Sequence, residues 1–281
     1  MNPGEKSVLY VVATPIGNLG DLSPRAAEVL GNVDFIASED TRVTRKLLAS
    51  MDIHKELVSC YREVESRKAD EIASRIASGE SCAFCSDAGT PGVSDPGQKL
   101  ADRCISLGIP VIPIPGCCAA AAAISASGMD CTRFCFEGFL PSSGKQRRER
   151  IAELKEEKRT IVLYEAPHRL RATLSDLLSE LGDRRIFVAR EMTKLHEEYM
   201  RTTLSAALAS LEGSEPRGEY AIVMEGASAG EAEVPDLQNA AEAARKLRNS
   251  GMSLSAACRK ASEETGVPRN ELYRLLCRED S

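Results

Sequence analysis

The chain has 281 residues, of which 43% are apolar, enough to build buried cores in two domains or in one large domain with an appendage. Its formal net charge of −6 at pH 7 excludes a basic surface over the whole molecule, so any contact with nucleic acid must be local. Aromatic residues make up 4% and Trp is absent, which argues against an extended base-stacking surface.

No apolar run approaches the roughly 18 to 20 residues that a membrane span needs, and no signal-peptide pattern opens the chain. We therefore expect a cytoplasmic protein without a membrane partner. Cys82 and Cys85 form a lone Cys-x-x-Cys inside an apolar run, which predicts core thiols rather than a metal site. The three histidines lack metal spacing and suggest no hydrolase triad, so we expect no metal.

The first predicted unit is a β-branched strand at 7–13, a glycine-containing loop and a helix that runs to Leu30. Ser23 and Pro24 suit the N-cap and first position of that helix. The loop is neither a Walker loop nor a Gly-x-Gly-x-x-Gly fingerprint, which argues against nucleoside triphosphate chemistry.

The next strand, 33–37, ends in Ser-Glu-Asp-Thr-Arg at 38–42. Charged residues at such a position are often only solvated. The alternative is that they face a cleft shared with the loops at 14–23 and 86–97. Both interpretations remain open from the sequence.

The loop at 86–97 follows a buried strand at 81–85 and contains three glycines, two prolines and two aspartates before a helix at 98–107. Loops at the carboxyl ends of strands in open α/β sheets bind small ligands, because the loop backbone offers unpaired N–H and C=O groups there. An ordinary connection tightened by Gly and Pro is the alternative.

A strand at 109–114 leads through Pro115 and Gly116 into an alanine-rich helix from Ala119. Small side chains let a ligand or a neighbouring element approach the N-terminus of such a helix, although close helix packing alone would also explain them. The alternation of strands and helices through residue 128 predicts a mainly parallel sheet.

Beyond residue 128 the pattern predicts a mixed sheet that ends in two hairpin-like strands at 198–203 and 218–225. The segment 142–158 is mostly a solvated helix face, but four basic residues could contact phosphate: Lys145, Arg147, Arg148 and Arg150. A small, acidic linker at 226–235 precedes three predicted helices that resemble a basic helix-turn-helix, suited to a nucleic-acid or a protein contact.

Six motifs occur in an order that resembles the tetrapyrrole-methylase-like, class III, S-adenosylmethionine-dependent methyltransferases, and within them the branch acting on small-subunit ribosomal RNA. They cover about residues 7–225 and are Tyr10-Val-Val-Ala-Thr-Pro-Ile-Gly-Asn-Leu, Ser38-Glu-Asp-Thr-Arg, Ser86-Asp-Ala-Gly-Thr-Pro-Gly-Val-Ser-Asp-Pro-Gly, Gly138-Phe-Leu-Pro, Tyr164-Glu-Ala-Pro-His-Arg and Arg190-Glu-Met-Thr-Lys. Any one motif would be weak evidence, but six in register are strong.

The resemblance implies an α/β fold with two α/β domains, 1–118 and 119–228, the cofactor in the cleft between them, and a helical appendage at 236–281. It also implies a homodimer and S-adenosyl-L-methionine as the cofactor. The cofactor-binding positions carried over to this chain are Pro15, Gly17, Asp87, Gly89, Thr90, Val93, Ser94, Cys118, Ala119, Tyr164, Ala221 and Ile222.

The same resemblance implies methylation of the ribose 2′-hydroxyl of a cytidine in the decoding region of small-subunit (16S) ribosomal RNA. A ribose hydroxyl is a weak acid, so a proton acceptor should lie beside it. Among the polar residues at strand ends we favour Asp40 as this acceptor, and Lys194 or Arg190 as the group that stabilises the developing alkoxide or a phosphate.

Two other functions remain open. A methylase of the same superfamily could act on a tetrapyrrole or another small acceptor, although such an acceptor needs neither the basic cluster nor the C-terminal helices. The chain could also be a non-catalytic nucleic-acid-binding regulator, although a disused cleft would not need intact Gly- and Pro-rich loops.

Overall fold

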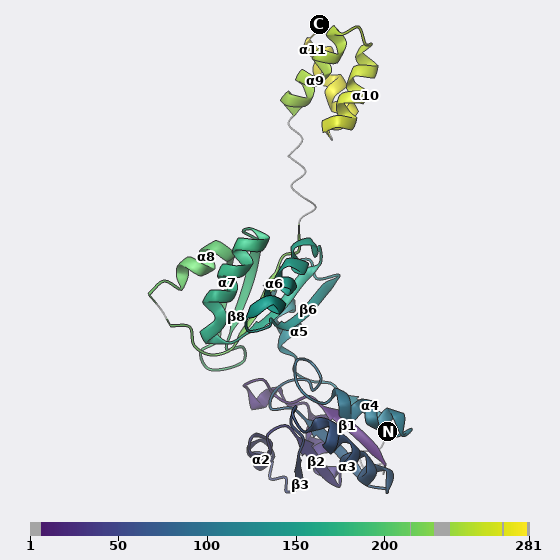
Figure 1. Cartoon of the computed structure of the whole chain (residues 1–281), viewed down its shortest axis with the longest axis vertical. Coiled ribbons are helices and arrows are strands. Elements are labelled where there is room, and N and C mark those ends of the chain that lie inside the picture. The colour runs from purple at the N-terminus through teal and green to yellow at the C-terminus, as the bar shows by residue number, and fades with distance from the viewer. Residues whose placement is uncertain (1–6, 214, 228–236, 266, 280–281) are drawn as a thin grey trace. The chain divides into compact units, whose positions relative to one another are not determined.

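The computed structural model describes residues 7–213, 215–227, 237–265 and 267–279 (Figure 1). The chain divides into two compact units, Met1–Gly226 and Ala227–Ser281. The first unit contains two five-stranded sheets, and the described part of the second contains helices only. The α/β fold class with a helical appendage is therefore confirmed. The boundary between the two sheet domains at residue 118 stays a prediction, and the predicted linker falls, from residue 228 on, outside the described residues.

The first sheet is entirely parallel, with the order β3-β2-β4-β1-β5, as the alternating pattern predicted. Its strands are β1 (Val8–Val12), β2 (Phe35–Ser38), β3 (Glu56–Ser59), β4 (Ser81–Cys85) and β5 (Val111–Ile114). Helices α1 (Pro24–Asn32) and α2 (Thr41–Ala49) cover one face, and α3 (Glu65–Ala77) and α4 (Gln98–Ser106) cover the other. Because both faces are covered, the central strands are buried and read as continuous apolar runs.

Local signals in the sequence account for several features of this sheet and its helices. The Ser23 hydroxyl accepts a hydrogen bond from the Ala26 N–H and Pro24 is the first residue of α1, as predicted. Cys82 and Cys85 are buried and free, so the prediction of core thiols is confirmed. Burial also raises the pKa of the Cys85 thiol to about 12, which keeps it protonated.

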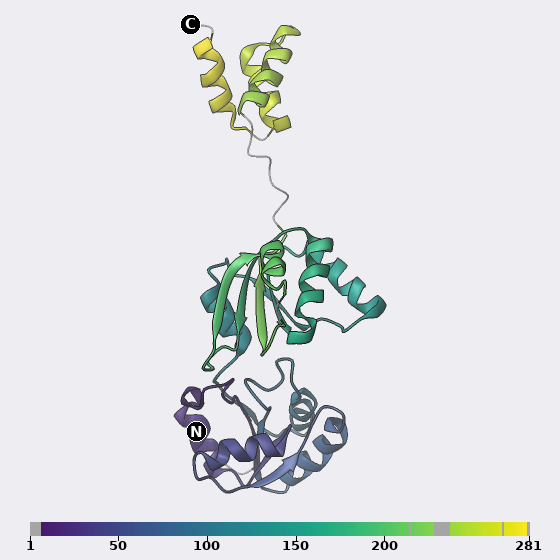
Figure 2. The same cartoon turned by 90° about the vertical axis from the view of Figure 1, so that its left-hand side faces the viewer.

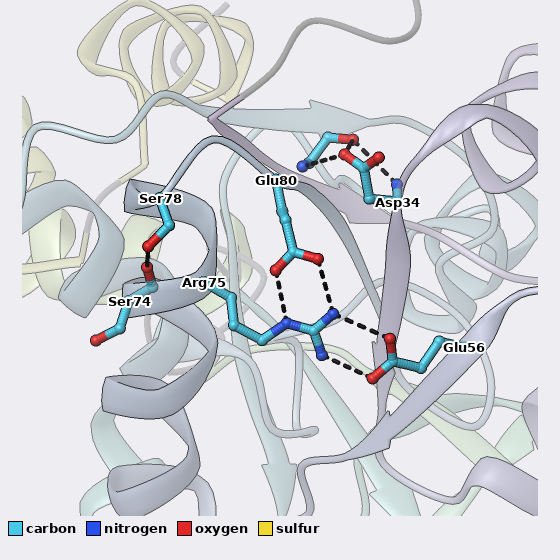
Figure 3. Close-up of polar contacts among 7 residues, drawn as sticks. Asp34, Glu56, Ser74, Arg75, Ser78 and Glu80 are labelled. Carbon is cyan, nitrogen blue, oxygen red and sulfur yellow. Dashed lines mark hydrogen bonds and ion pairs between the residues drawn. The ribbon is translucent and has the colours of Figure 1, made fainter.

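Ion pairs and hydrogen bonds hold the amino-terminal ends of the parallel strands together (Figure 3). Arg75 of α3 makes two-point contacts with Glu80 and with Glu56, at N···O distances of 2.7 to 3.0 Å. The Asp34 carboxylate accepts from the Ser81 N–H at 2.7 Å and from its hydroxyl at 2.8 Å. This polar frame lies at the end of the sheet opposite the carboxyl ends, where α/β proteins bind ligands.

The second sheet is mixed, with the order β6-β7-β10-β8-β9; β6 and β7 are parallel and the other neighbours are antiparallel. Its strands are β6 (Phe134–Phe139), β7 (Thr160–Glu165), β8 (Arg185–Arg190), β9 (Glu198–Thr203) and β10 (Tyr220–Met224). The prediction of a mixed sheet is confirmed. The predicted hairpin of the last two strands is wrong: both pair with β8, because β10 enters the sheet between β7 and β8.

Helices lie on both faces of this mixed sheet (Figure 2). The alanine-rich helix α5 (Ala119–Ser127) packs on one face. On the other face lie α6 (Gly144–Glu153), α7 (Pro167–Leu181) and α8 (Leu204–Ser210). The residues of β7 therefore alternate between two cores, with Val162 facing α5 and Leu163 facing α7.

The second unit contains α9 (Leu237–Asn249), α10 (Leu254–Thr265) and α11 (Arg269–Glu279), close to the three predicted helices. Their core is built largely from small side chains, including Ala240, Ala244 and Ala261, closed by Leu272 and Leu276. Small residues let helices approach closely, which explains a stable bundle with few large apolar groups. None of the helices in the described ranges is long and apolar enough to cross a membrane.

Candidate active site

A cavity of about 550 Å³ in the first unit is lined by loops of the parallel sheet and by strands and loops of the mixed sheet. This volume lies within the usual range of cofactor pockets, roughly 300 to 1,000 Å³. Loops of the parallel sheet and the start of α5 contribute Ile16, Glu39, Asp87, Ala88, Gly89, Thr90, Val93, Asp95, Cys118 and Ala119. The mixed sheet contributes Phe139, Tyr164, Glu165, Ala166, Pro167, His168, Met192, Glu219, Tyr220 and Ala221.

Hydrogen bonds join three loops of the parallel sheet into one surface. Thr14 and Gly89 exchange both backbone hydrogen bonds, at 2.9 and 3.0 Å, so the loops after β1 and β4 pair like two short strands. The Thr90 hydroxyl donates to the Cys117 carbonyl at 2.8 Å and ties in the loop after β5. The loop 86–97 is thus part of a cavity wall and not only a tightened connection.

The end of this loop is fixed by a buried carboxylate. Glu65, only 3% exposed, accepts from the Gly97 and Lys99 N–H groups at 2.8 and 2.9 Å, and so caps the N-terminus of α4 from another helix. Gly97 has a φ of +125°, and a Cβ there would lie 2.7 Å from the Phe84 ring. Both the conformation and the close approach therefore require glycine.

Three carboxylates of the parallel sheet form an anionic wall. Asp87 accepts from the Asp40 N–H at 2.9 Å, and the Asp87 N–H donates to Glu39 at 3.4 Å. Burial raises the pKa of Glu39 and of Asp87, and burial together with the charges of Glu39 and Asp87 raises the pKa of Asp95 to about 6. A carboxyl group that titrates this close to neutral pH in a cavity is a candidate for proton transfer.

The mixed sheet presents an aromatic and small-residue wall around Tyr164. The Tyr164 hydroxyl accepts from the Ala120 N–H at 2.9 Å, near the start of α5. Its ring meets those of Phe136 and Phe139 edge-on, with centroids 5.0 and 5.7 Å apart. Burial raises the pKa of Tyr164, which therefore remains a neutral phenol. Small side chains at the start of α5 do let a neighbouring element approach closely, as the sequence suggested.

A buried charge network supports this wall from behind. The Glu165 carboxylate is 2% exposed, accepts from the Ala166 N–H at 2.9 Å and from the Thr173 hydroxyl, and pairs with Arg169. Arg169 in turn donates to the Leu140 carbonyl at 2.6 Å. The motif residues 138–141 and 164–169 are thus joined to one another, and Glu165 is held mainly as a structural group.

The predicted basic cluster does not form one exposed surface. Arg147 is 7% exposed and donates to Asp176 at 2.8 Å and to the Pro141 carbonyl at 3.0 Å, so it belongs to the buried network. Arg150 pairs with Glu137 and Glu153. Lys145 pairs with Glu149. Three of the four basic side chains are thus engaged by carboxylates or carbonyls, and because Arg147 is buried among them, the prediction of a phosphate contact through Arg147 is wrong.

Eight of the twelve predicted cofactor-binding residues line the cavity: Asp87, Gly89, Thr90, Val93, Cys118, Ala119, Tyr164 and Ala221. The other four are not among its lining residues. Ile16 faces the cavity where Pro15 and Gly17 were expected, and the Gly17 backbone packs against Lys194. Ile222 faces the core beneath α7, because alternate residues of β10 point to opposite faces.

Ser94 has a structural position at the edge of the cavity. Its hydroxymethyl group abuts Gly138, where a Cβ would lie 2.4 Å from the serine oxygen, and its carbonyl accepts from Arg62 at 2.6 Å. Ser94 thus joins the loop of the parallel sheet to β6, and its contact with the cofactor stays a prediction.

The three predicted catalytic residues also lie off the cavity wall. Asp40 is the N-cap of α2, accepts from the Arg42 N–H at 2.8 Å and pairs with the Arg42 guanidinium at 2.6 Å. These bonds lower the pKa of Asp40 to about 2, which makes it a poor proton acceptor. The geometry therefore disfavours the role that we predicted for Asp40.

Lys194 and Arg190 are held by carboxylates. Lys194 pairs with Glu191 at 2.8 Å and with Glu219 at 2.9 Å. Arg190 pairs with Glu198 at 2.7 Å and donates to the Arg217 carbonyl at 2.8 Å. Both side chains stabilise the strand ends next to the cavity and do not point into it.

Sequence reasoning assigned no site role to several residues that do line the cavity, among them Asp95, Phe139 and Met192. All three lie inside the six motifs, so a signal existed, but nothing local distinguished them from their neighbours. Within the described ranges, no group of three or more His, Cys, Asp or Glu side chains is arranged to hold a metal ion.

Two family models match the chain. One, described as "Tetrapyrrole (Corrin/Porphyrin) Methylases", matches residues 8–208, and the other, described as "RsmI C-terminal HTH domain", matches residues 235–279. Solved structures with a similar fold include diphthine synthase, with a TM-score of 0.61 at 14% identity, covering 78% of this chain and 89% of that one. Another is uroporphyrin-III C-methyltransferase from Thermus thermophilus complexed with S-adenosyl homocysteine, with a TM-score of 0.56 at 17% identity, covering 77% and 96%.

Closer relatives carry one common name, "Ribosomal RNA small subunit methyltransferase I". The protein from Synechocystis sp. is 46% identical over 269 residues, covering 95% of this chain and 96% of its own. Those from Xylella fastidiosa and Escherichia coli O157:H7 are 43% and 41% identical, covering 94% and 95% of this chain and 97% and 93% of theirs. The similarity thus extends over both units of the molecule.

Proposed function

The chain belongs to the tetrapyrrole methylase family, in the group of ribosomal RNA small subunit methyltransferases I, and from this premise we propose that it methylates the ribose 2′-hydroxyl of a cytidine in the decoding region of 16S ribosomal RNA. The family resemblance expected from six motifs is confirmed. The protein is an S-adenosylmethionine-dependent methyltransferase of small-subunit ribosomal RNA. The atom and the nucleotide are the proposal.

The observation that supports this function best is similarity over nearly the whole chain. A tetrapyrrole methylase alone would explain residues 8–208, but the C-terminal unit also matches a domain described for the ribosomal RNA enzymes. A small acceptor would not need that unit. This argues against the alternative of a tetrapyrrole acceptor, and the formed cavity argues against a non-catalytic regulator.

The cavity residues fit S-adenosylmethionine. This cofactor supplies a methyl group that its sulfonium makes electrophilic. The charges of its ammonium and carboxylate cancel, so the sulfonium leaves the molecule with a net positive charge. The anionic wall of Glu39, Asp87 and Asp95 complements that charge. Val93, Ala119 and other small or apolar groups of the lining offer apolar surface.

We assign proton acceptance to Asp95 in place of Asp40. Asp95 lines the cavity, and with a pKa of about 6 it is mostly ionised at neutral pH yet basic enough to take a proton in the transition state. Positioning the reacting groups supplies most of the remaining acceleration in such a displacement. Lys194 and Arg190 act as positioning residues, since they fix the strand ends that carry Glu219 and Tyr220.

The proposal also includes a homodimer in the cytoplasm. Leu195 is 91% exposed and Leu19 is 58% exposed, which is a large exposure for apolar side chains and is consistent with a partner surface. Sedimentation equilibrium of the purified protein tests the dimer: twice the chain mass is expected, and a single-chain mass at micromolar concentration contradicts it.

Methyl transfer to small ribosomal subunits that lack their modifications tests the function directly. The purified protein and labelled S-adenosylmethionine should place label on one ribose 2′-oxygen, mapped by nuclease digestion and mass spectrometry. Label on a base, or on a ribose outside the decoding region, contradicts the proposed acceptor. If no label is transferred although calorimetry shows that the donor binds, the result would favour a small-molecule acceptor over ribosomal RNA.

A further inference from the structure

Phe139 is an aromatic side chain left half exposed at a junction of two cavities. It lies at the end of the edge strand β6 and its relative exposure is 51%. It lines the 550 Å³ cavity described above, and also a second cavity of about 360 Å³. An apolar ring in this position is available to contact a ligand that extends from one cavity into the other.

A β-bulge turns Phe139 toward the first cavity. Phe136 is opposite Val162 in the register with β7, but the register then shifts by one residue, and Phe139 comes opposite Tyr164. Without the extra residue, Phe139 would point to the face that carries Leu163, beneath α7. Bulges near active sites re-aim side chains in this way.

The backbone around Phe139 is held firmly on both sides. Gly138 has a φ of +63°, and Ser94 packs against it so closely that no Cβ fits. On the other side, Arg169 donates to the Leu140 carbonyl at 2.6 Å and Arg147 to the Pro141 carbonyl at 3.0 Å. The exposed ring is thus presented by a rigid support, which lowers the entropic cost of binding against it.

The second cavity combines apolar and hydrogen-bonding groups. Its apolar lining comes from Phe136, Phe139, Leu140 and Pro141, and its polar lining includes Gln146 and Glu149 of α6. Amide and carboxylate groups are those that recognise base edges by hydrogen bonding. Gln146 and Glu149 line the same cavity as Phe139, so they are available to hydrogen-bond a base that stacks on its ring.

We propose that Phe139 and this second cavity hold the nucleobase of the acceptor nucleotide, turned out of its RNA strand, so that its ribose faces the donor cavity. The inference rests on the proposed function, because it assumes an RNA acceptor. Bringing a single ribose into an enclosed cavity displaces that nucleotide from its stack, and an aromatic side chain compensates for the lost stacking. Phe139 is then a specificity and positioning residue for methyl transfer.

Replacing Phe139 by Ala should lower kcat/KM for unmodified small subunits by about 5- to 150-fold, the range for one lost base-aromatic stack. The Kd for S-adenosylmethionine, measured by calorimetry, should stay within about twofold of the wild-type value. The F139W variant should restore activity, because indole also stacks. Phe134→Ala is the matched control: Phe134 is 45% exposed on the same strand but lines neither cavity, so its loss should not alter turnover.

Fluorescence gives a readout that does not depend on catalysis. The chain has no Trp, so F139W introduces a single reporter. A synthetic RNA hairpin with the decoding-region sequence should quench it by stacking, and should leave the fluorescence of F134W unchanged. Quenching of F139W supports stacking of an RNA base on this residue even if the methyl group proves to go to another atom of the same nucleotide. Unchanged fluorescence, unchanged kcat/KM in F139A, or an equal loss of donor affinity in F139A would overturn it.

Discussion

The two sheets of the first unit contribute to the same cavity in different ways. The parallel sheet contributes loops at the carboxyl ends of its strands, with carboxylates whose pKa values are raised by burial. The mixed sheet contributes side chains of the strands themselves, with Tyr164 and Phe139 backed by a buried arginine network. The carboxylates with raised pKa values thus lie on loops of the parallel sheet, and the aromatic rings lie on strands of the mixed sheet.

This difference follows from the backbone. Loops after parallel strands have N–H and C=O groups outside the sheet ladder, so they can pair with each other, as Thr14 and Gly89 do, and still surround a ligand. Strands of the mixed sheet have little such freedom, and a bulge is needed to alter which face a side chain takes. Substitutions in the network behind the mixed sheet should therefore lower stability most, and substitutions on the loops of the parallel sheet should lower catalysis or donor binding.

The largest expected effect concerns the support of the mixed sheet. Arg147→Met should lower the free energy of unfolding by about 3 kcal/mol, because it removes the ion pair with Asp176 and the donor to the buried Thr173 hydroxyl. Chemical denaturation measures it. The neighbouring Arg148 is exposed, so Arg148→Met is the control and should leave stability unchanged. Equal effects of the two substitutions would refute the structural role of Arg147.

The next effect concerns chemistry on the loops of the parallel sheet. Asp95→Asn should lower kcat by about 100-fold, the scale of a lost general base, with the Kd of the donor changed much less. Asp40→Asn is the matched control, since Asn also caps helices well, and should keep nearly wild-type turnover. A collapse of turnover in Asp40→Asn but not in Asp95→Asn would restore the assignment made from the sequence.

The pH dependence of activity should show the same group. Because Asp95 must be ionised to accept a proton, kcat/KM should rise with pH through about 6 and then level off. This rise should be absent in Asp95→Asn. Because the pKa of Asp95 is raised in the folded protein, folding favours the protonated form of this carboxyl group. The stability that the protonated group contributes is fully present below pH 4 and is lost as the pH rises through about 6. Asp95→Asn should therefore raise the Tm at pH 7 and not at pH 4.

A smaller effect is expected at the carboxylate that anchors the loop 86–97. Glu65→Gln keeps the shape of the side chain but weakens its bonds to the Gly97 and Lys99 N–H groups, at a cost of about 1 to 2 kcal/mol in unfolding free energy. Because the loop lines the cavity, the Kd of the donor should rise as well. Calorimetry with unchanged donor affinity would show that the loop keeps its shape without this cap.

The smallest effect is expected at the opposite end of the parallel sheet. Arg75 pairs with Glu56 and Glu80 (Figure 3). Its guanidinium carbon also lies 3.8 Å from the centre of the Phe35 ring. Arg75→Lys keeps the charge and loses the two-point geometry, at a cost of about 0.5 to 1 kcal/mol. Donor affinity and turnover should not change. A loss of activity would show that the two ends of this sheet are coupled.

The sequence by itself determined the local elements. Apolar runs, caps such as Ser23 and the alternation of elements predicted the parallel sheet, the mixed sheet and the helical appendage, because those signals act between near neighbours in the chain. The order of the motifs was enough to indicate the family, and most of the residues predicted to bind the cofactor do line the cavity. The place of β10 between β7 and β8 could not be predicted, because strand order depends on contacts distant in sequence.

Only the tertiary structure decided what individual polar and aromatic side chains do. Arg147 looked like part of an exposed basic run, yet Asp176 and Pro141 turn it inward. Asp40 looked like a free carboxylate at a strand end, yet it caps a helix and pairs with Arg42. Phe139 faces the cavity because of one bulge. In each case the partner or the neighbouring strand determines where the side chain points, and the spacing of residues in the sequence does not indicate which partner will be near.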